Sequence, residues 1–92
     1  MNIDTIWNNV LANEGKVFHQ IKGKAFTYTA NNSKTSISLG TTNQSITKNL
    51  LEKAVMLLPF SDTVPLQHLR SPSYLYAILT HKRIILSVHD KG

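Results

Sequence analysis

The sequence contains no cysteine, which excludes a disulfide framework, a thiolate nucleophile and a zinc ribbon. No apolar run approaches the length of a membrane-spanning helix, and the first residues lack the basic and apolar regions of a signal peptide. We therefore expect a cytoplasmic protein with no membrane partner. The chain of 92 residues suits one small domain, 1–92, with a single modest core.

Patterns of catalytic and metal-binding residues are missing too. The acidic residues lie far apart in the sequence, and there is no glycine-rich phosphate loop. His68, His81 and His89 do not share the spacing of metal ligands on one element. We expect no enzymatic activity, no cofactor and no bound metal.

Acidic side chains are scarce relative to basic ones. Ten Lys and Arg residues stand against five Asp and Glu, which gives a formal net charge of +5. A basic balance favours anionic partners such as nucleic acid. The basic residues are spread along the chain and form no Lys/Arg block.

The clearest helix signal lies in the middle of the chain. Thr47 is a natural N-cap, because its hydroxyl can accept from the free N–H groups of the first turn. The predicted helix covers residues 48–58 and ends at Pro59. Its apolar side chains share one arc at the helical period: Leu50, Leu51, Ala54, Val55, Leu57 and Leu58. Met56 falls on the polar side of the helix. Two interpretations fit it: a helix-end residue partly covered by a neighbouring loop, or a contact to a partner.

An earlier helix is predicted over residues 5–13, with Asp4 as its N-cap and Ile3 outside the cap. Trp7 lies on its apolar stripe, which indicates a core residue rather than a platform for a ligand. Gly15 supplies the left-handed turn that ends the helix.

The segment between these helices alternates like a strand meander. A Gly23-Lys24 turn of type II′ would place Ile21 opposite Phe26 and His19 opposite Tyr28. A second turn at Asn31-Asn32 would place Tyr28 opposite Thr35 and Phe26 opposite Ile37. Both registers put the same apolar set on one face: Val17, Ile21, Phe26, Tyr28, Ile37 and Leu39. His19 falls on the same face, and we expect it to be a semi-buried, hydrogen-bonded histidine rather than a catalytic one.

The opposite face of the predicted sheet is polar and basic, with one aromatic side chain. It carries Lys16, Phe18, Gln20, Lys22, Thr27, Thr29, Ser36 and Ser38, with Lys24 and Lys34 at the turns. Such a face can follow a phosphate backbone and stack a base. It is also what an ordinary solvated antiparallel face looks like.

The last third of the chain predicts a loop over residues 60–70, then a helix opened by Ser71 and Pro72. Tyr74, Leu75, Ile78 and Leu79 face the core in this helix. Residues 84–88, Ile-Ile-Leu-Ser-Val, are mostly apolar and three of them are β-branched, which predicts a short final strand.

Several of these residues form a pattern that resembles a small module of uncharacterised bacterial and phage proteins. The likeness covers residues 7–84, and three groups carry it: Ile21, Gly23, Phe26 and Tyr28; Asn43, Ile46, Lys48, Glu52, Lys53 and Ala54; Pro72, Ser73, Tyr74, Ala77, Ile78, Leu79, Arg83 and Ile84. The chain departs from the module at three positions: it has Thr42 where the module has an arginine before the Asn43 position, Ser71 where the module has a glycine, and His81 near the position of an acid. Some of its members accompany restriction or mobile-element proteins, so the resemblance implies a nucleic-acid partner.

Together these patterns predict an α+β fold in the order α-β-β-β-α-α, with a short C-terminal strand and helices on one face of a three-stranded antiparallel meander. The expected function is that of a small non-enzymatic nucleic-acid-binding module. Its predicted phosphate contacts are Lys22, Lys24, Lys34 and Lys48. Asn43 and Gln44, in the polar loop 41–45, are the predicted contacts to base edges. The alternative is a protein-interaction or self-association module, as a homodimer or with another protein, using Tyr76, Met56 or the edge strands.

Overall fold

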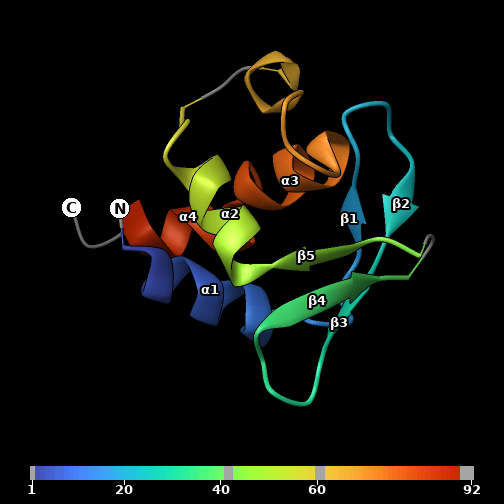
Figure 1. The fold of residues 1–92 in the computed structure, drawn as a ribbon, viewed down its shortest axis with the longest axis vertical. Coiled ribbons are helices and arrows are strands. Elements are labelled where there is room, and N and C mark those ends of the chain that lie inside the picture. The colour runs from blue at the N-terminus through green and yellow to red at the C-terminus, as the bar shows by residue number, and fades with distance from the viewer. Residues whose placement is uncertain (1, 41–42, 60–61, 90–92) are drawn as a thin grey trace.

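The computed structural model describes residues 2–40, 43–59 and 62–89, and gathers most of the helices on one side of the molecule and the strands on the other (Figure 1). The elements are α1 (Ile3–Ala12), β1 (Phe18–His19), β2 (Ala25–Phe26), β3 (Tyr28–Ala30), β4 (Ser36–Leu39), β5 (Ser45–Thr47), α2 (Lys48–Val55), the 3-10 helix η1 (Val64–Leu66), α3 (Pro72–Leu79) and α4 (Lys82–His89). Helices and antiparallel strands are thus combined in one core, which confirms the predicted α+β class.

The strands form two antiparallel sheets rather than one meander. β1 and β2 make a two-stranded sheet, and β3, β4 and β5 make a three-stranded one in that order. The chain passes from the first sheet to the second at Thr27, whose carbonyl accepts a hydrogen bond from Gly40 at 2.8 Å. The third strand of the larger sheet, β5, was not predicted: it joins Ser45, the last residue of the predicted polar loop 41–45, to the two residues before α2.

The predicted register of the first hairpin is wrong by three residues. Phe18, and not Ile21, lies opposite Phe26. The chain turns through the loop 21–23, which is closed by a 2.9 Å hydrogen bond from Gln20 N to the Lys24 carbonyl. Gly23, with φ +94°, takes the last loop position, where a left-handed residue is required.

Because the register shifts by an odd number of residues, the side chains of β1 exchange faces. Phe18 is fully buried, and its ring lies 6.0 Å from that of Phe26 and 5.4 Å from that of Tyr28. Val17 and Ile21, predicted for the core, are 48% and 47% exposed. His19 is exposed as well, so its predicted semi-buried position is wrong.

The predicted register of the second hairpin is wrong by four residues. Tyr28 lies opposite Leu39 instead of Thr35. The loop is wider because the Asn31 side-chain oxygen accepts from the backbone N–H groups of Thr35 and Ser36, at 2.9 and 3.2 Å. An even shift keeps each side chain on its face, so Tyr28, Ile37 and Leu39 are buried as predicted.

The strand β5 leads directly into α2. Ile46 pairs with Ile37 and is fully buried, which holds this strand on the sheet. Thr47 then caps α2, since its hydroxyl accepts from Leu50 N at 3.1 Å, and the predicted N-cap is confirmed.

The helix α2 ends at Val55, three residues earlier than predicted. Leu51, Ala54 and Val55 are buried, which confirms the centre of the predicted apolar face. Met56 is 80% exposed.

The helix α1 begins earlier than predicted. Its N-cap is Asn2, whose side-chain oxygen accepts from Asp4 N at 2.8 Å, so Asp4 lies inside the first turn. Trp7 is buried, as predicted. Gly15 has φ +84° and ends the turn after α1, also as predicted.

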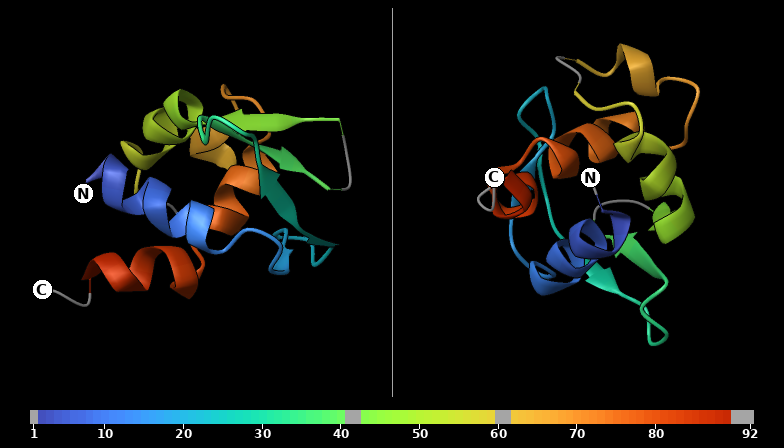
Figure 2. Two further views of the ribbon diagram at one scale, coloured as in Figure 1. Left: turned by 90° about the horizontal axis from the view of Figure 1, so that it is seen from below. Right: turned by 90° about the vertical axis from the view of Figure 1, so that its left-hand side faces the viewer.

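The predicted C-terminal strand is wrong, because residues 82–89 form the helix α4. The ring nitrogen Nδ1 of His81 accepts from Arg83 N at 3.0 Å and so caps the new helix. Asn9 of α1 donates to the Ile84 carbonyl at 2.9 Å, and Ile84 is fully buried. Packing against α1, which Figure 2 shows beside α4, overrides the β preference of this apolar run.

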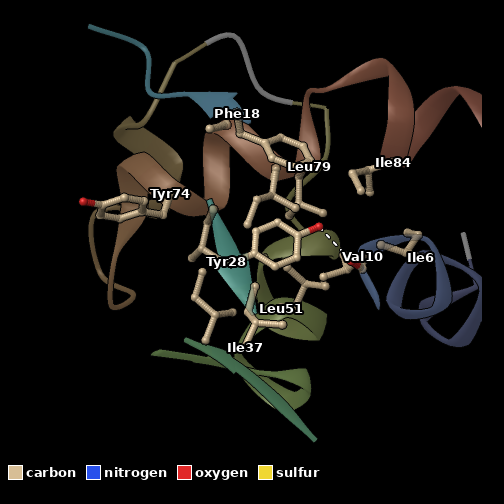
Figure 3. Close-up of a cluster of buried hydrophobic side chains, with 14 of the residues drawn as sticks. Ile6, Val10, Phe18, Tyr28, Ile37, Leu51, Tyr74, Leu79 and Ile84 are labelled. Carbon is tan, nitrogen blue, oxygen red and sulfur yellow. Dashed lines mark hydrogen bonds between the residues drawn. The ribbon is translucent and has the colours of Figure 1, made fainter. Parts of the chain in front are cut away.

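The shared core lies between the helices and the larger sheet (Figure 3). Tyr28 stands in it, and its hydroxyl donates to the Val10 carbonyl at 2.7 Å. Burial raises the pKa of the Tyr28 phenol well above its usual value. The core therefore sets the position of the strands relative to α1. The exposed polar and basic side chains lie on the surface around this core.

Candidate nucleic-acid interface

The β1–β2 hairpin carries two of the predicted phosphate contacts. Lys22 lies in the loop 21–23 and Lys24 directly follows it, and both side chains are exposed. Lys16, just before β1, is exposed as well. These ammonium groups project from a rigid base, since the hairpin is anchored by the buried rings of Phe18 and Phe26.

The start of α4 brings further cations to the same hairpin. Arg83 donates from Nη1 to the Val17 carbonyl at 2.8 Å, and its guanidinium carbon lies 5.5 Å from the centre of the Phe18 ring. His81 packs edge-on against Phe18, with 4.8 Å between ring centres. We call this assembly the basic corner: Lys16, Lys22, Lys24, Lys82 and Arg83, with His19 and His81.

The surroundings of His81 in the basic corner favour the neutral form of its ring. Its Nδ1 accepts from Arg83 N, so the ring proton sits on Nε2. Burial lowers the pKa of His81, and the charges of Arg83, His19 and Lys82 lower it further.

Carboxylates are absent from the segments that build the basic corner. Residues 15–51 contain five lysines and no acid, and residues 63–89 contain Arg70, Lys82 and Arg83 and no acid. Within residues 2–40, 43–59 and 62–89, the one ion pair joins Lys48 to Asp4. Two other described carboxylates accept from backbone N–H groups, Glu14 from Ala30 N at 2.6 Å and Asp62 from Val64 N at 2.9 Å.

Two of the predicted phosphate contacts lie away from the basic corner. Lys48 opens α2, and its Nζ contacts the Asp4 carboxylate at 2.6 Å, which offsets its charge. Lys34 belongs to the β3–β4 loop, at the other end of the long axis from the β1–β2 loop (Figure 1). Its backbone carbonyl accepts from the Trp7 indole at 2.9 Å. The four predicted lysines therefore do not form one patch.

The predicted base contacts lie at a separate hollow. Asn43 and Gln44 precede β5 and line an open pocket of about 450 Å³ together with Ser45, Arg70 and Ser71. The Ser71 hydroxyl donates to the side-chain oxygen of Gln44, which ties the start of α3 to the start of β5. We call this hollow the polar pocket. Thr41 and Thr42, the rest of the predicted loop, lie outside the described residues.

Sequence patterns missed several residues of these two surfaces. Phe18, predicted to stack a base, is buried beneath Arg83 and cannot do so. Arg83 was named only as part of the resemblance, and Arg70 was expected only in a loop. Arg83 gives no local signal, because it contacts the β1 side of the fold at Val17, 66 residues away, and Arg70 gives none, because the pocket that it lines is completed by residues around the start of β5.

The described residues contain no group of three or more His, Asp or Glu side chains arranged to hold a metal ion. None of their helices is both long and apolar enough to span a membrane. Comparisons of the chain with protein-family models, curated proteins and solved structures gave no match.

Proposed function

We propose that this protein is a small non-enzymatic nucleic-acid-binding module and that the basic corner is its phosphate-contacting surface. The observation that carries the proposal is the contact of Arg83, from one acid-free segment, with the hairpin of the other acid-free segment, on which Lys16, Lys22 and Lys24 are exposed. Such a surface attracts a polyanion without sequence preference. Lys22 and Lys24 supply mobile charge, whereas the fixed guanidinium of Arg83 can orient a phosphate.

The second candidate is a protein-interaction surface, and exposed apolar side chains favour it. Met56 is 80% and Val64 is 69% exposed, at the end of α2 and in η1. A partner that used these side chains would leave the basic corner untouched. The two functions can therefore be separated by substitution.

The test is a titration of labelled single- and double-stranded oligonucleotides at several salt concentrations. The paired change Lys22→Gln and Lys24→Gln should weaken binding similarly for every sequence. Each lost phosphate contact should flatten the slope of log K against log salt by about 0.7 to 0.9. Lys53→Gln is the matched control, since it removes one exposed lysine on α2, outside the basic corner.

Two results would contradict the proposal. No binding at low salt would leave the protein-interaction surface as the better candidate, to be tested with Met56→Ser and Val64→Ser. Equal losses from Lys53→Gln and from either single hairpin change would mean that nucleic acid does not bind at the basic corner.

A further inference from the structure

The polar pocket differs from the basic corner in shape and in chemistry. It is concave, with a volume of about 450 Å³. Ligand pockets range from roughly 300 to 1,000 Å³, so a nucleotide-sized group fits it. The described residues that line it carry amide, hydroxyl and guanidinium side chains: Asn43, Gln44, Ser45, Arg70 and Ser71.

The walls of the pocket are held in place by hydrogen bonds across the fold. Ser71 donates to the Gln44 side chain, and the Gln44 carbonyl accepts from Leu39 N at 3.1 Å. The pocket therefore joins two segments that are each fixed to a packed element, the β4–β5 sheet and α3. A ligand would meet a largely preformed site.

The central cation of the pocket is uncompensated. The guanidinium of Arg70 forms no hydrogen bond or ion pair with any other residue that the structure describes, and the same holds for the side chains of Asn43 and Ser45. None of the described residues that line the pocket carries a carboxylate. Convergent donors around a free guanidinium are suited to an anion with several oxygens.

Among such anions the lining favours a phosphomonoester. None of the described residues that line the pocket is apolar or aromatic, so this lining suits the phosphate and the attached sugar better than the base. A monoester carries roughly 1.5 to 2 negative charges near neutral pH, against one for an internal phosphodiester. The greater charge gains more from Arg70.

We propose that the polar pocket binds a phosphomonoester, supplied by the terminal phosphate of a nucleic-acid strand. Arg70 holds the phosphate in a bidentate contact, and Asn43 and Ser45 donate to the remaining phosphate and sugar oxygens. The site itself follows from the pocket alone. Only the choice of a strand end as its source rests on the proposed function, and a free mononucleotide is the other source of the same chemistry.

The test compares matched oligonucleotides with a 5′-phosphate, a 3′-phosphate or no terminal phosphate, with AMP and adenosine as free ligands. One phosphorylated end should bind about tenfold more tightly than the unphosphorylated strand, as expected for charge-assisted hydrogen bonds. Arg70→Gln should abolish this difference, and Arg70→Lys should retain part of it. Lys53→Gln is the charge-matched control and should leave the difference unchanged. Thermal unfolding of each variant checks that the fold is intact.

The outcomes separate the pocket from the basic corner. If AMP but not adenosine shifts the amide signals of Asn43, Ser45 and Arg70, while no strand end is preferred, the phosphomonoester site stands with the free nucleotide as its source. This result would hold even if no oligonucleotide bound and the proposed function failed. Equal binding of all strand ends together with no response to AMP overturns the inference. A preference that survives Arg70→Gln also overturns it, whatever the hairpin variants show.

Discussion

The phenol of Tyr28 donates a 2.7 Å hydrogen bond to the carbonyl of Val10, while the Tyr28 carbonyl accepts from Gly15 N at 2.9 Å. One strand residue is thereby joined at two points to α1 and the turn that follows it. Because Tyr28 lies opposite Leu39 in β4, these bonds set the position of the whole larger sheet against α1. The placement of the strands that carry the basic corner and the polar pocket therefore depends on this contact.

Removing the phenol should therefore cost stability without emptying the core. Tyr28→Phe keeps the buried ring and loses one hydrogen bond, for an expected loss of about 1 kcal/mol in the free energy of unfolding. The cost is moderate because the Val10 carbonyl keeps a second donor, Asn13 N, at 3.2 Å. Urea denaturation measures it, with the exposed Thr29→Ala as control. An unchanged midpoint would show that the hydroxyl is not held inside the core.

The buried face of α2 gives a larger expected effect. Leu51 is fully buried and Val55 nearly so, and each truncation to Ala should lower the free energy of unfolding by about 2 to 4 kcal/mol. Lys53→Ala, on the exposed side of the same helix, should stay within about 0.5 kcal/mol of the parent. The same denaturation experiment compares the three variants. Losses from Leu51→Ala no larger than those from Lys53→Ala would contradict the assigned face.

These core positions were predictable from the sequence because their signals are local. The cap at Thr47, the apolar arc of α2 and the left-handed turn at Gly15 each depend on residues within a few positions. The registers were not predictable in the same way. Gly23 suits either a two-residue or a three-residue hairpin loop, and the Asn31 side chain widens a loop that the sequence alone leaves at minimum length.

The candidate site was predictable only in part, for a similar reason. Lys22, Lys24, Asn43 and Gln44 lie in turns that the sequence marks clearly, and the structure exposes all of them. Their partners come from distant segments: Arg83 reaches Val17, and Ser71 reaches Gln44. Such pairings depend on how the helices dock on the strands. The α4 segment shows this most directly, since its packing on α1 determines that it is a helix.

His81 predicts a pH dependence of stability. Its pKa is lowered in the folded protein, so the unfolded chain binds the proton first as the pH falls. Stability is therefore fully present above the ordinary histidine pKa of about 6.5 and falls as the pH drops from there toward the lowered value. Protonation would also remove the Nδ1 lone pair that accepts from Arg83 N.

The substitution His81→Asn keeps a capping side chain and removes the titration. The free energy of unfolding, measured by urea between about pH 7.5 and about pH 5.5, should depend less on pH in this variant than in the parent. The exposed His68→Asn is the control and should keep the parent's slope. If His81→Asn shows the same slope as the parent, the pKa of His81 is not lowered by the fold.

The ion pair between Lys48 and Asp4 predicts how Lys48 behaves toward nucleic acid. Its partner offsets the lysine charge at 2.6 Å, so Lys48→Gln should weaken binding less, and flatten the salt slope less, than Lys22→Gln. Asp4→Asn should strengthen binding, because it frees Lys48 and removes a negative charge. The pair is exposed, so its loss should cost no more than about 1 kcal/mol of stability.

Lys48→Gln should weaken binding more in the Asp4→Asn background than in the parent, and titrations of the two single variants and the double variant measure that difference. Equal effects of Lys48→Gln in both backgrounds would mean that Asp4 does not restrain the lysine in solution.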